Sequence, residues 1–216
     1  MPYKIVPVEG NIAAGKSRLL TELQEVADNN GIRIIYVQEP VSEWGTIRNK
    51  DNIDILTLFY NDQNKYAFSF QMMAYISRLV SIKRAVESVN DNENCIIICE
   101  RSVWTDRNVF AKMLYDEGKI EEINFQIYIR WFDEFVNEYP VSAIIYIPTP
   151  PILCAERVKL RNRSGEEIPL EYLERCHQYH VDWLNKSTCK ILTIDPHFTS
   201  DVKVEIVDFI NTLGFK

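Results

Sequence analysis

The stretch Gly10-Asn11-Ile12-Ala13-Ala14-Gly15-Lys16-Ser17 decides the fold that this sequence predicts. It satisfies the pattern G-x-x-x-x-G-K-[ST] at every fixed position, and it stands between an apolar run and a helical pattern. Its glycines let the backbone turn tightly, so that N–H groups point at phosphate oxygens near the positive end of a helix. We therefore predict that these eight residues bind a nucleoside triphosphate such as ATP. Lys16 should reach the β- and γ-phosphates, and the Ser17 hydroxyl should ligate Mg²⁺.

The rest of the chain alternates short β-branched runs with longer helical patterns. Strands are expected at residues 3–8, 33–37, 95–99, 143–147 and 190–194. Helices are expected at residues 16–29, 54–89, 103–117, 120–138, 151–161, 170–184 and 200–213. This alternation predicts an α/β fold with helices on both faces of a parallel sheet, in one domain that spans residues 1–216. Pro7 fits a central strand poorly, because proline lacks an N–H donor, and we expect a local bulge there.

Charge and cysteine content exclude several kinds of partner. The 216 residues carry a formal net charge of −7, which argues against a protein that coats a nucleic-acid polymer. No apolar stretch reaches the ~18 residues of a membrane span, and the first strand begins too early for a leader peptide. We therefore expect a cytoplasmic protein with no membrane partner and with reduced thiols. The cysteines, odd in number and without a C-x-x-C pair, are Cys95, Cys99, Cys154, Cys176 and Cys189.

Charged side chains follow the second and third expected strands. Glu39 comes shortly after one, and Glu100 and Arg101 come directly after the other. Ligands of open α/β sheets bind beyond the carboxyl ends of the strands. A carboxylate at Glu39 can accept a hydroxyl proton during phosphoryl transfer, whereas an acceptor with its own phosphate would require a cation there. Glu100 is placed to act beside Mg²⁺, and Arg101 can bridge Glu39 and the transferred phosphoryl group.

Four cations lie close together later in the chain, at Arg157, Lys159, Arg161 and Arg163. A charge run of this kind is commonly a solvated helix face. This protein is acidic, however, and needs local cations to hold a triphosphate. We therefore favour an arginine-rich lid at about residues 157–169 that closes over the γ-phosphate.

Other functions remain open on the residues alone. A nucleoside monophosphate kinase of the thymidylate type shares this sheet and loop, but it would need an arginine near Glu39 to hold the phosphate of its acceptor. A P-loop switch or nucleotide sensor would bind ATP and phosphorylate no nucleoside. Cys176, His177 and His180 could suggest zinc, but no second ligand pair accompanies them, and a packing role is favoured.

Together, these motifs resemble the deoxynucleoside kinase family, most closely its deoxycytidine and deoxyguanosine kinases. The stretches that carry the resemblance are EGNIAAGKS (9–17), EPVSEW (39–44), FQMMAYISR (70–78), ERSVWTDRNVFA (100–111) and RNRSGEEIPLEYLERCHQYHVDWL (161–184). The resemblance implies a P-loop kinase fold with a five-stranded parallel sheet. It also implies a homodimer that transfers phosphate from ATP to the 5′-hydroxyl of a deoxynucleoside with the help of Mg²⁺.

The resemblance also implies roles for single positions. Glu39 matches the catalytic base, Arg101 matches its arginine partner, and Lys16 completes the catalytic set. The lid residues Arg157, Arg161 and Arg163 match contacts to the triphosphate. Phe198, in a segment that matches the family only loosely, would contact the adenine.

The positions that the resemblance places around the nucleoside are Trp44, Leu56, Tyr60, Phe70, Gln71, Ala74, Arg78, Asp106 and Phe110. Gln71 should bond the edge of the base between aromatic rings, and Arg78 with Asp106 implies cytosine or a purine rather than thymine. Tyr60 and a lid glutamate should hold the 3′-hydroxyl. Either Glu166 or Glu167 can be that glutamate, and counting along the lid favours Glu166.

Overall fold

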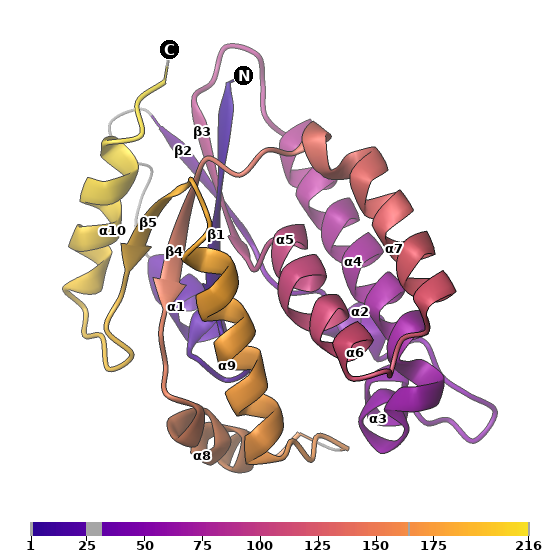
Figure 1. Cartoon of the computed structure of the whole chain (residues 1–216). Helices are drawn as coiled ribbons and strands as arrows, with labels where there is room; N and C mark the ends of the chain where they lie inside the picture. Colours follow the sequence, from indigo (N-terminus) through magenta and orange to yellow (C-terminus); the bar gives the residue numbers. More distant parts are fainter. Residues whose placement is uncertain (1, 25–31, 164, 216) are drawn as a thin grey trace.

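A parallel sheet stands at the centre of the fold (Figure 1). The computed structural model describes residues 2–24, 32–163 and 165–215, and within these ranges five strands pair in the order β2-β3-β1-β4-β5. Every pairing is parallel, as predicted. The predicted strands are confirmed, with the bounds β1 Tyr3–Gly10, β2 Arg33–Val37, β3 Cys95–Glu100, β4 Ala143–Ile147 and β5 Lys190–Thr193.

The helices follow the predicted pattern with local differences. Their bounds, together with the π-helical η1 and the 3-10 helix η2, are α1 Lys16–Leu23, α2 Val41–Trp44, α3 Ile55–Asn61, α4 Gln63–Glu87, α5 Val103–Thr105, η1 Asp106–Ala111, α6 Lys112–Asp116, α7 Glu122–Phe135, η2 Val136–Glu138, α8 Pro151–Arg161, α9 Leu170–Leu184 and α10 Val202–Asn211. The short helix α2 was not predicted. Residues 25–29 of the helix expected at 16–29 lie outside the described residues.

Two predicted helices are not continuous α-helices. The prediction of one helix over 54–89 was wrong, because Asp62 separates α3 from α4 and its carboxylate accepts the Lys65 N–H at 3.2 Å. An aspartate in this position satisfies a free N–H at the start of a helix. The helix predicted at 103–117 contains the π-helical turn η1, a local widening that often occurs at functional sites.

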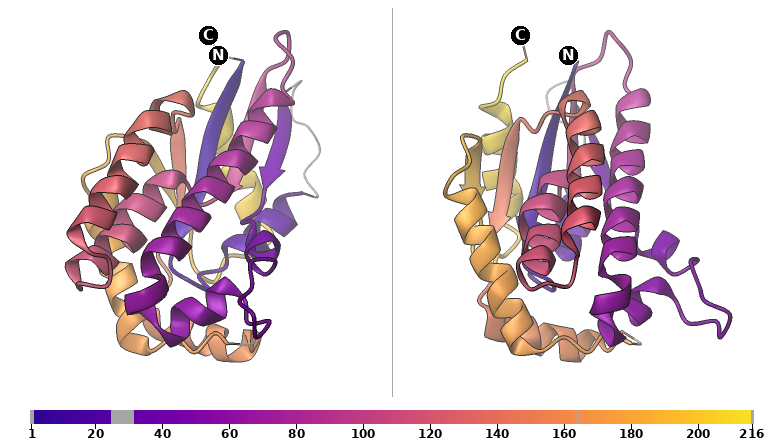
Figure 2. Two further views of the ribbon diagram at one scale, coloured as in Figure 1. Left: turned by 90° about the vertical axis from the view of Figure 1, so that its right-hand side faces the viewer. Right: turned by 45° about the vertical axis from the view of Figure 1, so that its right-hand side comes forward.

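Helices cover both faces of the sheet, as predicted (Figure 2). On one face, α1 and α10 pack against a cluster that contains Val6 and Val8 of β1. On the other face, Ile82 of α4 packs with Ile5 and Ile97 from neighbouring strands. Successive side chains of a strand point to opposite faces, so both sets of positions must be apolar in a sheet that is buried on both sides.

Pro7 lies in β1 at an irregular point of the sheet. Ile5 faces Val141 and Val8 faces Ile145, so three steps along β1 match four steps on the β4 side. The Ser142 N–H donates to Ile5 O at 2.8 Å, which shows that odd-numbered residues of β1 direct their backbone groups toward β4. The absent N–H of Pro7 therefore lies opposite this irregular pairing, in which the extra residue belongs to the segment before β4 and β1 itself stays continuous.

The carboxyl ends of the strands meet at one edge of the sheet, and both termini of the chain lie at the opposite end (Figure 1). The phosphate loop follows β1 at this edge, and α2 follows β2. Active sites of open parallel sheets lie at this edge. Within the described ranges, no helix is both long and apolar enough to cross a bilayer.

Candidate active site

The phosphate loop connects the end of β1 with the start of α1. Gly10 has a φ of +146°, and a Cβ at this position would lie 2.7 Å from the carbonyl oxygen of Ile147, so only glycine fits. The Lys16 ammonium donates to Asn11 O at 2.8 Å. The loop therefore closes into a cradle around Lys16. Its residues that line the central cavity are Ile12, Ala13, Gly15, Lys16 and Ser17, while Gly10, Asn11 and Ala14 are buried.

The two predicted metal ligands lie together. The Ser17 hydroxyl donates to Glu100 Oε1 at 2.9 Å, and the Lys16 ammonium lies 4.0 Å from the same oxygen. Burial, with a smaller effect from Arg101, lowers the pKa of Lys16 to about 8. In the described part of the chain, no three or more His, Cys, Asp or Glu side chains gather into a metal site. Two oxygen ligands suit Mg²⁺, which takes its other ligands from phosphate and water.

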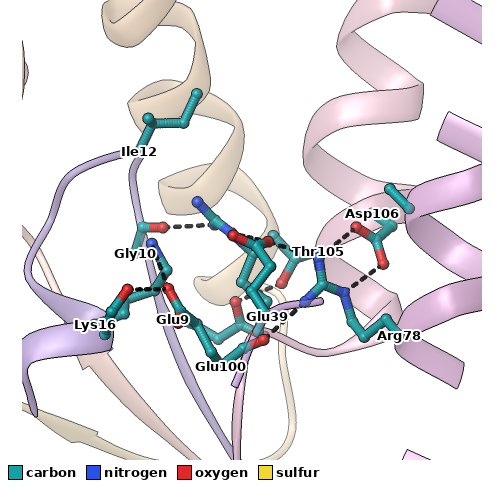
Figure 3. Close-up of polar contacts among 12 residues, drawn as sticks. Glu9, Gly10, Ile12, Lys16, Glu39, Arg78, Glu100, Thr105 and Asp106 are labelled. Atoms are coloured by element: carbon teal, nitrogen blue, oxygen red, sulfur yellow. Dashed lines mark hydrogen bonds and ion pairs between the residues drawn. The ribbon is translucent and has the colours of Figure 1, made fainter. Parts of the chain in front are cut away.

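Glu39 lies at the junction of several charged groups (Figure 3). Its Oε1 accepts a hydrogen bond from Arg78 Nη2 at 2.8 Å and lies 3.4 Å from Arg101 Nε. Burial by itself would raise the pKa of Glu39, but Arg78, Arg101 and Lys16 outweigh burial and lower the pKa to about 2. Glu39 is therefore a carboxylate at neutral pH.

Arg78 does more than the sequence indicated. Its Nε and Nη2 donate to the two carboxylate oxygens of Asp106 at 2.8 and 3.2 Å, and its Nη1 donates to Glu100 O at 2.7 Å. Sequence reasoning named only Arg101 as the partner of Glu39, whereas Arg78 makes the shorter contact. Figure 3 shows the Arg78 guanidinium between Asp106 and Glu39. Both Arg78 and Asp106 are buried, so they form one desolvated network with Glu39.

One cavity of about 520 Å³ joins the phosphate loop to the predicted nucleoside residues. Gln71 is 2% exposed, and its Oε1 is buried without a hydrogen-bond partner. Trp44 and Phe70 meet edge to face at 5.4 Å, which gives this end of the cavity an aromatic wall. An unpaired buried acceptor beside aromatic rings fits a planar ligand that brings its own donor. The predicted nucleoside residues that line the cavity are Trp44, Leu56, Tyr60, Phe70, Gln71, Ala74, Arg78, Asp106 and Phe110.

Four residues of the predicted lid line the cavity, namely Arg157, Arg161, Arg163 and Glu166. The Arg161 Nη2 donates to both carboxylate oxygens of Glu166 at 2.7 Å. Glu167 is exposed and does not line the cavity. Ser164 of the lid lies outside the described residues.

Arg157 and Phe198 lie beside the phosphate loop. The Arg157 guanidinium donates to Ala14 O at 2.9 Å and to Pro196 O at 3.0 Å. Phe198 is buried, and the guanidinium carbon of Arg18 lies 4.6 Å from the centre of its ring. Phe198 does not line the central cavity. Its ring lies beside Gly15, where a Cβ would come within 3.6 Å of the Phe198 ring.

Sequence reasoning missed Glu9 and Tyr172. The buried Glu9 carboxylate accepts the Ser102 N–H at 2.9 Å and the Ser102 hydroxyl at 2.7 Å, and it also bonds the Thr105 hydroxyl. Glu9 thus holds the turn that carries Glu100 and Arg101. A charged residue at the end of an apolar strand was the signal that could have identified it. Tyr172 lines the cavity from α9, and nothing in the sequence pattern marked it.

Comparison with known proteins links this geometry to a family. The family model described as deoxynucleoside kinase matches residues 6–213. The chain belongs to the deoxynucleoside kinase family. It is 33% identical over 235 residues to the deoxycytidine kinase of Homo sapiens, covering 97% of this chain and 88% of the human protein. It is also 33% identical to deoxycytidine kinase 2 of Gallus gallus, and the match covers 86% of this chain and 76% of the chicken protein. The mitochondrial deoxyguanosine kinase of Xenopus laevis is 33% identical, and the match covers 88% of this chain and 77% of the Xenopus protein.

Membership of the deoxynucleoside kinase family identifies the chain as an enzyme that phosphorylates nucleosides and as a P-loop kinase fold. The predicted fold and enzyme class are therefore confirmed. A thymidylate-type kinase and a P-loop switch no longer fit. The packing role favoured for His180 agrees with the structure, where the residue is fully buried and its Nδ1 bonds Cys176 O at 2.7 Å.

Proposed function

We propose that this enzyme transfers the γ-phosphate of ATP to the 5′-hydroxyl of deoxycytidine, deoxyadenosine or deoxyguanosine in nucleotide salvage, and that it disfavours thymidine. One observation carries this proposal. A single cavity contains the phosphate loop at one end and the unpaired Oε1 of Gln71 at the other, with Glu39 between them. A donor phosphate and an acceptor hydroxyl could therefore meet beside a carboxylate.

The donor end fits a triphosphate and Mg²⁺. The loop cradle supplies backbone N–H groups, and Lys16 adds a buried ammonium that would hold the β- and γ-phosphates. Ser17 and Glu100 would hold Mg²⁺, which neutralises phosphate charge when it is bound. Arg161 and Arg163 would close over the γ-phosphate from the lid, while Arg157 would fix the lid helix against the loop.

At the acceptor end of the cavity, Glu39 would act as the general base. The 5′-oxygen would form a bond to the γ-phosphorus while the bond from that phosphorus to the bridging oxygen of ADP breaks, and the hydroxyl proton would pass to Glu39. A carboxylate with a pKa of about 2 is a weak base, so its main work is to orient the hydroxyl and accept its proton late. This suits a loose transition state, in which the nucleophile needs little activation. Arg101 would neutralise charge on the transferred group.

The base preference rests on Arg78 and Asp106. Their buried pair lines the cavity, where the carboxylate would accept from an exocyclic amine and repel a carbonyl oxygen. Cytosine, adenine and guanine each carry an exocyclic amine on the Watson–Crick edge, whereas thymine carries only carbonyl oxygens and a ring N–H there. Gln71 can donate and accept, so it serves more than one base. A misplaced polar edge reduces kcat/KM by about ten- to a hundred-fold.

The 3′-hydroxyl would bond Tyr60 and Glu166. Both line the cavity, whereas Glu167 is exposed, which supports Glu166 of the two alternatives. Burial, and next the Glu166 carboxylate, raise the pKa of Tyr60, so its hydroxyl stays protonated and can donate.

We also propose a cytoplasmic homodimer. Ile123, Ile127 and Trp131 form an exposed stripe on α7, and Ile76 is exposed on the adjacent helix α4. A second copy of the chain would cover this stripe, whereas Phe132 of the same helix already lies in the core. The five cysteines are free thiols, four of them buried, which suits a reducing compartment.

An assay of acceptors tests the proposed function. Purified enzyme with ATP and Mg²⁺ is given each of the four deoxynucleosides and the monophosphates of deoxycytidine and thymidine. We expect turnover of deoxycytidine, deoxyadenosine or deoxyguanosine with a kcat/KM at least ten-fold above that for thymidine. Turnover of a monophosphate alone, or thymidine as the best acceptor, would contradict the proposal.

A further inference from the structure

Helix α9, which follows the lid, touches the catalytic machinery along one face. Leu173, Cys176 and His180 lie at helical spacing on this face, and all three are buried. The carbonyl oxygen of Leu173 accepts the side-chain N–H of Asn11 in the phosphate loop at 2.8 Å. His180 lies two turns further along the helix, and its Nε2 is 3.5 Å from Arg101 Nη1.

The contacts of His180 determine where its proton lies. Its Nδ1 is 2.7 Å from the carbonyl oxygen of Cys176, which can only accept, so Nδ1 carries the hydrogen. Burial, and next the charge of Arg101, lower the pKa of His180 well below its ordinary value, which keeps the ring neutral. Its Nε2 then presents a lone pair toward a guanidinium that can only donate.

Arg101 has an unusual backbone conformation, and several groups fix its side chain. Its φ is +64°, a left-handed conformation that is rare outside glycine. Its Nη1 donates to Gly10 O at 2.7 Å, and the guanidinium carbon lies 4.9 Å from the centre of the Phe110 ring. The His180 ring meets the same Phe110 ring edge to face at 6.3 Å. The guanidinium is thus held at Nη1 by the phosphate loop and α9, and its Nε remains near Glu39.

We propose that His180 is a positioning residue that orients Arg101 for phosphoryl transfer by accepting from its Nη1. The inference rests on the proposed function, in which Arg101 neutralises charge on the transferred phosphoryl group. Without the acceptor, Nη1 keeps Gly10 O alone, and the guanidinium can rotate about the Phe110 ring. Contacts of this kind are often long in a ligand-free enzyme and shorten in the reacting complex. Since His180 touches neither the phosphate loop nor Gln71, its loss should lower kcat and leave KM nearly unchanged.

Two substitutions separate the contact with Arg101 from packing. His180→Asn keeps an amide N–H for Cys176 O and removes the acceptor at Nε2. His180→Gln places an amide oxygen where Nε2 stood. We expect His180→Asn to lower kcat about ten-fold with KM for both substrates within two-fold, and His180→Gln to retain kcat within three-fold. His177→Asn, one turn earlier on α9 and only partly buried, is the matched control and should leave kcat unchanged.

A double-mutant cycle decides whether His180 acts through Arg101. In an Arg101→Ala background, His180→Asn should change kcat by less than two-fold, because the group that it orients is gone. An equal loss in both backgrounds, or equal kcat for the Asn and Gln variants, would overturn the inference. Should His180→Asn fail to fold by circular dichroism, His180→Met is compared with His180→Gln, since these two differ in the acceptor and share a shape. If the unsubstituted enzyme phosphorylates no deoxynucleoside, the proposed function fails instead.

Discussion

The two ends of the cavity differ in how the chain forms them. The donor half, residues 10–17, is one continuous loop with a tight turn at Gly10 and the bond from Lys16 to Asn11, and Arg101 and Arg157 bond its carbonyl oxygens. The acceptor half, the residues around Gln71, is assembled from α2, α3, α4 and η1, and Arg78 joins it to Glu39. A substitution in the donor half should therefore leave nucleoside binding around Gln71 largely unchanged. A substitution at Arg78 should disturb both the binding of the nucleobase and the Glu39 carboxylate.

The largest effect is expected in the donor half. Lys16→Met preserves length and removes the ammonium, so kcat should fall by about 10³ because charge on the β- and γ-phosphates is no longer neutralised. Binding of the deoxynucleoside, measured by calorimetry without ATP, should change less than two-fold. A large loss of nucleoside affinity would show that the two halves are not independent in this direction.

The second prediction tests the coupling through Arg78. In the variant Arg78→Met with Asp106→Ala, the repulsion of thymine disappears, and the ratio of kcat/KM for thymidine to that for deoxycytidine should rise about ten-fold. Because Arg78 also makes the shortest contact with Glu39, kcat for every nucleoside should fall by about 10². Arg84→Met, on the exposed side of the same helix, is the control. A change of preference with full kcat would separate base selection from catalysis.

The third prediction concerns the lid. Glu166→Ala should lower kcat/KM for a 2′-deoxynucleoside by about ten-fold or more and have little effect on a 2′,3′-dideoxynucleoside, because the group that it holds is then absent. Glu167→Ala is the matched control and should leave both values unchanged, since its side chain is exposed. Dependence on the 3′-hydroxyl at Glu167 instead would reverse the assignment.

The smallest effect is expected from pH. Lys16, with a pKa of about 8, loses its charge in the free enzyme as pH rises, so kcat/KM for ATP should be about ten-fold lower at pH 9 than at pH 7. At saturating ATP the rate should stay flat, because bound phosphate restores the ammonium. The unfolded chain keeps this proton up to about pH 10.5, so the free energy of unfolding should rise between pH 8 and 10.5. A flat profile of kcat/KM would contradict the lowered pKa.

The same contrast explains how much the sequence could predict. The position of the phosphate loop between β1 and α1 was predictable because eight consecutive residues define the motif, and the strands were predictable from their apolar runs. The pairing of Arg78 with Glu39 was not, because it joins side chains 39 residues apart through a network that also includes Asp106. The break at Asp62 was visible in principle as a capping aspartate. The π-helical turn η1 was not visible, because it depends on packing against α4 and α9.

The kcat of Glu39→Gln tests the central claim most directly. The substitution preserves size, and its amide oxygen can still accept from Arg78, so it removes little more than the negative charge and the ability to take a proton. Because Glu39 is ionised at every ordinary assay pH, the effect should not depend on pH between 6 and 8. We predict that kcat falls by about 10² or more while the dissociation constant of deoxycytidine stays within about three-fold. A variant with near-normal kcat would contradict the claim that phosphoryl transfer occurs at Glu39.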